Sequence, residues 1–210
     1  MKRPNLLSPS SLIIVTTLAS LSTAHAHHAE AMSGKPFLQG LSMPLHGLDH
    51  VLSALAVGLV AAQVGGRLRL WFPLLFSLFL LVGGCLNLSG VSLPELTVPI
   101  ATMALGAVIY YGKIRMVSFA GFAVLLAAVV NGQALLEKPV LLSSPLFFLG
   151  CAFSGLLVCL IGFLVGTVLR LNAKHSVARL TGAAVALGAA ILAFVPEWND
   201  CVIRLIEGVR

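Results

Sequence analysis

The stretch GLSMPLHGLDHVLSALAVG, residues 40–58, places two histidines and an aspartate at the start of an otherwise apolar run. Pro44 has a backbone angle suited to the first turn of a helix, so the sequence predicts a helix that begins near Pro44. In such a helix His46, Asp49 and His50 stand at positions i, i+3 and i+4 and project from one face. We therefore expect a polar cluster at one end of a buried helix.

The composition is that of an integral membrane protein. Of the 210 residues, 59% are hydrophobic and 10% are charged, and the mean hydropathy is +1.03. A soluble domain of this length does not require so apolar a chain. The formal net charge is +6, but the basic residues stand singly between apolar runs. They are therefore interpreted as topology signals, and the expected partner is the lipid bilayer and not nucleic acid.

Residues 1–26 have the three parts of a secretory signal peptide. Two basic residues come first, a mainly apolar stretch covers residues 12–21, and the sequence AHA at 24–26 matches a small-x-small cleavage site. The alternative is an uncleaved transmembrane helix, but this stretch is short against the ~20 residues that span a bilayer. We expect cleavage after Ala26, so that the mature chain begins at His27.

Six apolar segments follow the signal, each long enough to cross a bilayer as a helix. They cover residues 45–64, 70–88, 93–111, 116–136, 145–171 and 178–195. They lack the alternation of barrel strands, and backbone groups in lipid must be bonded within the segment. The predicted fold is therefore all-α, a polytopic membrane protein with six transmembrane helices in one domain, residues 27–210.

Further features predict how these helices pack. The loops are short, so consecutive helices are expected to be antiparallel neighbours. Small residues such as Gly162 and Gly166 allow close approach of helices. Pro99 removes one backbone hydrogen bond inside the third segment and predicts a kink there.

Basic residues predict the orientation, because loops rich in lysine and arginine stay cytoplasmic. Those that follow the first, third and fifth segments are Arg67 and Arg69, Lys113 and Arg115, and Arg170, Lys174 and Arg179. Both mature termini are then periplasmic, in a bacterial inner membrane. The first and third helices begin, and the second and fourth end, at the outer face, which also receives Glu95, Asn87 and Asn131.

Two imidazoles and a carboxylate suit divalent nickel, cobalt, zinc or copper, whereas calcium and magnesium call for more oxygen ligands. The sequence thus predicts that His46, Asp49 and His50 bind a transition-metal ion. The alternative is that Asp49 caps the helix while both histidines lie in the membrane interface.

Other acidic and histidine side chains are candidates for the same ion. Glu95 follows Pro94 at the start of the third helix, where a carboxylate either balances a bound cation or interacts favourably with the helix dipole. His27 and His28 lie next to the new amino terminus and either chelate metal or belong to a solvated tail.

The chain carries no enzyme motif. Neither Gly-x-Ser-x-Gly nor His-Glu-x-x-His occurs, and the sequence HGLDH at 46–50 lacks the glutamate that such hydrolases place between the histidines. We predict no enzyme and no catalytic cofactor, with haem ligation by His46 or His50 as an alternative. The four cysteines form no Cys-x-x-Cys pair, so no structural zinc site is expected, and a disulfide between Cys85 and Cys201 is left open.

These motifs resemble the HupE/UreJ family of small membrane proteins, whose first helix has the pattern His-Pro-x-x-Gly-x-Asp-His. Residues 43–50 read Met-Pro-Leu-His-Gly-Leu-Asp-His, so Pro44, Gly47, Asp49 and His50 match. The stretch from Glu95-Leu96 to Leu105-Gly106 is similar to a family stretch of the same length. The resemblance implies a permease that carries nickel, or sometimes cobalt, into the cell for hydrogenase or urease.

The chain departs from the family pattern at two places. Met43 replaces the leading histidine, and if Met43 itself binds, softer ions such as Cu(I) are favoured. Many relatives end the fourth helix with His-Gly-x-x-His-Gly, whereas residues 131–136 read NGQALL. This second departure favours an alternative function, that of a non-transporting membrane metal chaperone or accessory protein for metalloenzyme maturation. No ATP-binding motif occurs, and a homo-oligomer is left open.

Overall fold

The computed structural model describes residues 35–64, 68–89, 91, 93–94, 96–111, 117–135, 144–172 and 175–194. This part of the chain contains seven α-helices, one short 3-10 helix and no strand, which confirms the all-α prediction. The elements are α3 (Pro36–Ser42), η1 (Met43–His46), α4 (Leu48–Val64), α5 (Leu68–Leu88), α6 (Thr97–Tyr111), α7 (Val117–Leu135), α8 (Pro145–Asn172) and α9 (His175–Phe194). The predicted signal peptide lies outside the described residues.

Each of the six apolar segments overlaps one of the helices α4 to α9 over most of its length. Four of these, α5, α7, α8 and α9, are long and apolar enough to cross a membrane. A fifth span is counted if α3, η1 and α4 together form one broken span, and α6 has only 15 residues. The structure therefore supports a membrane protein with four or five candidate spans, and six complete spans stay a prediction.

The first apolar segment does not form one helix from Pro44, so that prediction is wrong. Pro44 lies in η1, and Gly47 has an extended backbone (φ −117°, ψ 120°) that separates η1 from the start of α4 at Leu48. The preceding helical pair and α4 meet at an angle of 87°. Three residues that the sequence placed on one helix are therefore divided between two elements.

Pro99 does not kink α6, contrary to the sequence prediction. The helix begins at Thr97, so Pro99 lies in its first turn. Backbone N–H groups in the first turn have no partner within the helix, and a proline there removes no hydrogen bond.

Pairs of glycines bring the backbones of neighbouring helices into direct contact. A Cβ atom on Gly58 of α4 would overlap the Cys159 carbonyl of α8, and a Cβ atom on Gly162 would overlap the Leu55 carbonyl of α4. The same kind of two-way contact joins Gly40 with Gly150, Gly83 with Gly132, and Gly106 with Gly182. Close approach at small residues is how helices associate in lipid. The prediction that Gly162 allows such an approach is confirmed.

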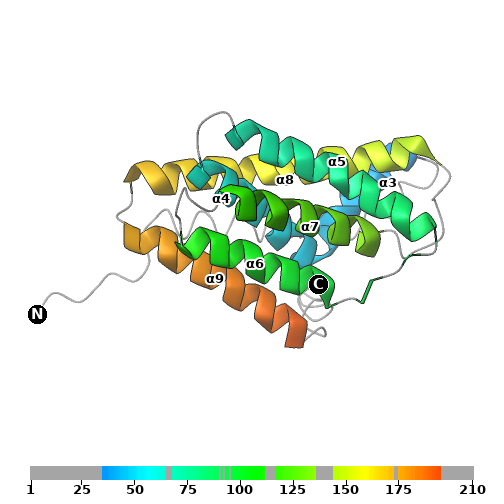
Figure 1. Cartoon of the computed structure of the whole chain (residues 1–210). Coiled ribbons are helices and arrows are strands. Elements are labelled where there is room, and N and C mark those ends of the chain that lie inside the picture. The colour runs from blue at the N-terminus through cyan, green and yellow to red at the C-terminus, as the bar shows by residue number, and fades with distance from the viewer. Residues whose placement is uncertain are drawn as a thin grey trace, which may run out of the picture.

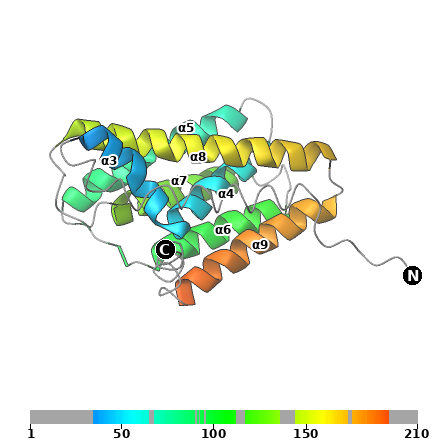
Figure 2. The same ribbon diagram turned by 180° about the vertical axis from the view of Figure 1, so that it is seen from behind.

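These contacts decide which helices are neighbours. The closest pairs are α4 with α8, α5 with α7 and α6 with α9, and none of them is consecutive in the chain. The expectation that consecutive helices pack together is therefore wrong for most of the bundle. Figures 1 and 2 show α5 and α8 along one side, α6 and α9 along the other, and α4 and α7 between them.

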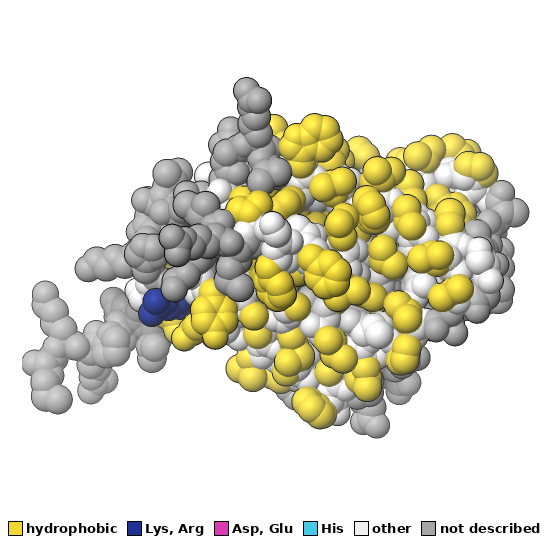
Figure 3. Space-filling view, viewed as in Figure 1, with side chains coloured by type: hydrophobic (Ala, Val, Ile, Leu, Met, Phe, Trp, Pro, Cys, Tyr) yellow, Lys and Arg dark blue, Asp and Glu magenta, His cyan; other side chains and the backbone are white. Residues whose placement is uncertain are grey.

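The outer surface of the bundle is apolar. Figure 3 shows hydrophobic side chains over most of the described part of one face. Trp71 at the start of α5 and Tyr110 and Tyr111 at the end of α6 are exposed by 57%, 41% and 61%. Tryptophan and tyrosine gather where a membrane meets water, so this end of the bundle has the composition of a membrane interface.

The glycine contacts can be tested with Gly162→Ala. The added methyl group meets a backbone carbonyl that cannot move unless α4 and α8 separate, so we expect a loss of stability of about 1–3 kcal/mol. Gly121→Ala is the matched control, because nothing lies within 4 Å of a Cβ at that position. Thermal unfolding of purified protein in detergent measures the difference, and equal melting temperatures for Gly162→Ala and wild type would contradict the contact.

Candidate metal site at the start of α4

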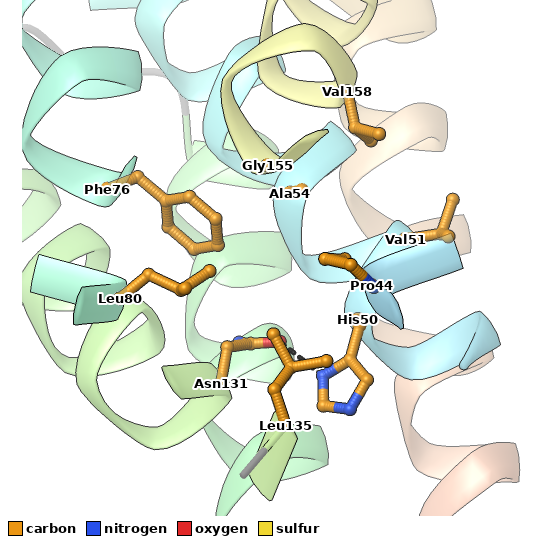
Figure 4. A pocket seen from close by; sticks show the side chains of 10 residues that line it. All are labelled: Pro44, His50, Val51, Ala54, Phe76, Leu80, Asn131, Leu135, Gly155 and Val158. Atoms are coloured by element: carbon orange, nitrogen blue, oxygen red, sulfur yellow. Dashed lines mark hydrogen bonds between the residues drawn. The ribbon is translucent and has the colours of Figure 1, made fainter. Parts of the chain in front are cut away.

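Hydrogen bonds link the start of α4 to the end of α7. His50 Nδ1 lies 2.8 Å from Asn131 Oδ1, and Asn131 Nδ2 donates to Ser53 Oγ at 2.8 Å and to the Ala127 carbonyl at 2.7 Å. Figure 4 shows the His50 ring beside the Asn131 amide. Ser53 and Asn131 are buried and His50 is half-buried. Buried polar groups are costly when unpaired, so these bonds fix the two helix ends together.

The ends of α4, α5 and α7 meet as the topology predicted. Asn87 Nδ2, near the end of α5, donates to the Gln133 carbonyl near the end of α7 at 3.0 Å. We call this region, where α4 begins and α5 and α7 end, the His50 end of the bundle. The prediction that Asn87, Asn131 and His50 lie at the same end of the bundle is therefore confirmed.

Gly47 makes room for Asp49 and His50 together. A Cβ atom on Gly47 would lie 2.6 Å from His50 Cδ2 and 2.7 Å from Asp49 Oδ1. Both side chains thus fold back from the first turn of α4 over the same backbone position. The Gly47 backbone conformation is one that any residue adopts, so glycine is needed here for space and not for its φ angle.

His46 does not share a helical face with these two residues. It ends η1, its side chain is exposed, and its Nδ1 lies 2.8 Å from the Ser42 carbonyl. Met43 begins η1 and packs against the apolar core. Within the described ranges, no three His, Cys, Asp or Glu side chains are grouped so that they could hold a metal ion. The break at Gly47 is the reason why the predicted three-residue cluster is not assembled.

The other predicted ligands, Glu95, His27 and His28, lie outside the described residues, as does Cys201. Cys85 is described and exposed. A feature that the sequence reasoning missed is Ser53, which stands three residues after His50 on α4 and receives a hydrogen bond from Asn131. Its spacing from His50 was the available signal, since residues three apart lie on one helix face.

The family profile described as HupE / UreJ protein matches residues 13–192. The chain belongs to the HupE/UreJ family. It is 32% identical to Protein HupE of Rhizobium leguminosarum bv. viciae over 186 residues, which cover 85% of this chain and 96% of that protein. No solved structure matches the chain.

The HupE/UreJ pattern helps to interpret a small cavity beside His50. The cavity has a volume of about 10 Å³, and its wall includes Asn131 and Leu135 together with apolar side chains such as Phe76 and Leu80. Such a volume accommodates about one water molecule at most. Asn131 and Leu135 are the positions at which the sequence resemblance expects histidines. This HupE/UreJ chain therefore brings both positions to His50 but fills them with an amide and an alkyl group.

The bundle of this HupE/UreJ protein becomes apolar beyond Ser53. Val57 and Val60 of α4, Leu105 of α6 and Val124 of α7 have no exposed surface. The buried hydroxyl of Thr102 donates to the Val98 carbonyl of its own helix. The polar groups of the His50 end are thus followed by an interior of buried apolar side chains.

The hydrogen bonds of Asn131 can be tested with Asn131→Leu, which keeps a similar volume. The change leaves buried Ser53 and half-buried His50 without this partner, so we expect a loss of stability of about 1–3 kcal/mol. Asn87→Leu removes an amide that donates one hydrogen bond at a half-buried position. This change should lower the free energy of unfolding by about 0.5–1.5 kcal/mol. Chemical unfolding of both variants in detergent gives the comparison, and an Asn131→Leu protein as stable as wild type would contradict the role of these bonds.

Proposed function

We propose that this HupE/UreJ protein is an inner-membrane permease that moves a divalent transition-metal ion from the periplasm to the cytoplasm. Nickel is the proposed ion, and cobalt, copper and zinc are the alternatives. The observation that carries the proposal is the shared position of Asp49 and His50 over Gly47. A carboxylate oxygen and an imidazole nitrogen are donors that these ions accept. Two such donors at the first turn of a membrane helix provide a place for a cation.

Energetics supports a functional role for Asp49. An acidic residue at the centre of a membrane helix costs about 2.5–3.5 kcal/mol on insertion scales, and less near the ends, so such residues are functional by default. Asp49 lies in the first turn of α4, where the helix dipole also favours a negative charge. The dipole offsets part of this cost, and a bound divalent cation would offset more.

Further ligands are proposed on both sides of the break at Gly47. His46 is exposed on η1 and would meet the ion before Asp49 and His50, and Met43 is a softer donor in the same element. We assign Glu95 the role of balancing charge across the entrance. His27 and His28 would capture the ion at the mature amino terminus.

The proposed direction of transport rests on the two ends of the bundle. In the sequence, basic residues follow α4, α6 and α8, the helices that end opposite His50, and exposed Trp71, Tyr110 and Tyr111 lie at that end. By the positive-inside rule that end is cytoplasmic, which makes the His50 end periplasmic. No catalytic activity is proposed, since no nucleophile and base pair was found in the sequence.

A second candidate function is a membrane metal chaperone or accessory protein that binds the ion without transporting it. It is favoured by the apolar interior beyond Ser53, where Val57, Val60 and Val124 are fully buried. An ion held by Asp49 and His50 would meet no further polar side chain at these positions. In this case the site delivers its ion back to the periplasmic side or to a partner protein.

Metal binding can be tested with His50→Ala, Asp49→Ala and Gly47→Ala. His50→Ala and Asp49→Ala each remove a metal-binding group. Gly47→Ala keeps both groups but displaces their side chains. We therefore expect Ni²⁺ uptake by cells to fall toward the empty-vector level in all three variants. Competition binding on purified protein should show Gly47→Ala weaker by about tenfold or more. Gly121→Ala is the control. Wild-type uptake by His50→Ala cells would reject the proposed site.

Transport can be separated from binding with purified protein in liposomes that enclose a Ni²⁺-sensitive dye. A permease should quench the dye after Ni²⁺ is added outside, whereas vesicles with His50→Ala protein and vesicles without protein should stay bright. If wild-type protein binds Ni²⁺ while the enclosed dye is unchanged, the accessory function replaces the permease.

A further inference from the structure

We propose that Asn131 fixes the tautomer of His50, so that Nδ1 carries the proton and Nε2 is the ring nitrogen that takes the metal ion. The inference rests on the proposed function, because it assigns a positioning residue to the same site. The two residues are joined by a hydrogen bond between α4 and α7, which are far apart in the chain.

The orientation of the Asn131 amide is determined by its partners. The Ala127 carbonyl can only accept a hydrogen bond, so the atom that lies 2.7 Å from it must be Nδ2. Ser53 Oγ lies 2.8 Å from the same nitrogen and accepts its second hydrogen. An amide turned the other way would bring two oxygens together at Ala127. Oδ1 therefore faces His50.

This orientation determines the proton on His50. Asn131 Oδ1 can only accept, and it lies 2.8 Å from His50 Nδ1. Nδ1 must therefore carry a hydrogen, and a neutral imidazole with Nδ1–H has its lone pair on Nε2. Asn131 is only 1% exposed, so water does not compete for its oxygen. Without this acceptor both tautomers of the ring would be accessible.

The geometry leaves Nε2 available for a ligand. Figure 4 shows the second ring nitrogen on the side of His50 turned away from Asn131 and from Leu80. No hydrogen bond from Nε2 is formed within the described part of the chain. Histidines that bind metals characteristically donate their other ring N–H to a second acceptor, which fixes tautomer and orientation. His50 and Asn131 have this arrangement.

The same rule applies to His46. Its Nδ1 lies 2.8 Å from the Ser42 carbonyl, which only accepts, so His46 also carries its proton on Nδ1. His46 is exposed, however, and water competes for that bond. The buried amide therefore makes His50 the more firmly oriented of the two.

The inference can be tested by ¹⁵N NMR of histidine-labelled protein in detergent, at an alkaline pH where free imidazole is neutral. His50→Gln identifies the His50 signals. We expect a protonated Nδ1 and a lone pair on Nε2 in wild type, and a shift toward the other tautomer in Asn131→Ala. Asn131→Asp supplies an acceptor oxygen and should restore the wild-type pattern. Asn87→Ala is the matched control at a neighbouring helix end and should leave His50 unchanged.

Competition binding with Ni²⁺ provides the second measurement. Asn131→Ala should bind about 10- to 100-fold more weakly than wild type, and Asn87→Ala should bind equally well. A wild-type His50 with its proton on Nε2 overturns the inference without any variant. If His50→Gln binds Ni²⁺ as tightly as wild type, the proposed function fails, whereas the tautomer assignment stands or falls by the NMR result alone.

Discussion

Contact between a glycine of one helix and a backbone carbonyl of another is the constraint on which the bundle depends. Lipid is as apolar as a leucine side chain, so hydrophobicity alone gives one helix little preference for another. Glycines on both partners, such as Gly58 and Gly162, allow an approach that any larger residue prevents. A similar pair, Gly83 and Gly132, joins α5 to α7. The helix ends at the candidate metal site are thus positioned by contacts deeper in the bundle.

The helices themselves could be predicted from the sequence, but their partners could not. Apolar runs determine where a chain can lie in lipid, and the segments predicted at 70–88 and 145–171 agree closely with Leu68–Leu88 and Pro145–Asn172. The helix that a glycine contacts depends on the arrangement of the whole bundle, so it cannot be predicted from the spacing of residues along one segment. Short loops therefore suggested consecutive neighbours, whereas the glycines selected pairs distant in the chain.

The candidate site was predictable in its residue types and only partly in its geometry. Asp49 and His50 were expected near the start of a helix, and Asn131 at the same end of the bundle. The separation of His46 was not expected, because Pro44 is equally compatible with the first turn of a long helix and with a 3-10 turn. The bonds from Asn131 to Ser53 and His50 join residues 78 and 81 positions apart, which single-sequence periodicity does not reveal.

The sharp angle between α3 and α4 has a mechanical consequence. Both helices pack against α8, α3 through Gly40 and Gly150 and α4 through Gly58 and Gly162. The single helix α8 therefore contacts the chain on both sides of Gly47. Sliding of α8 along α4 would carry α3 and η1 with it and change the distance between the His46 and His50 rings. A small shift of one helix would therefore alter the geometry of the candidate site.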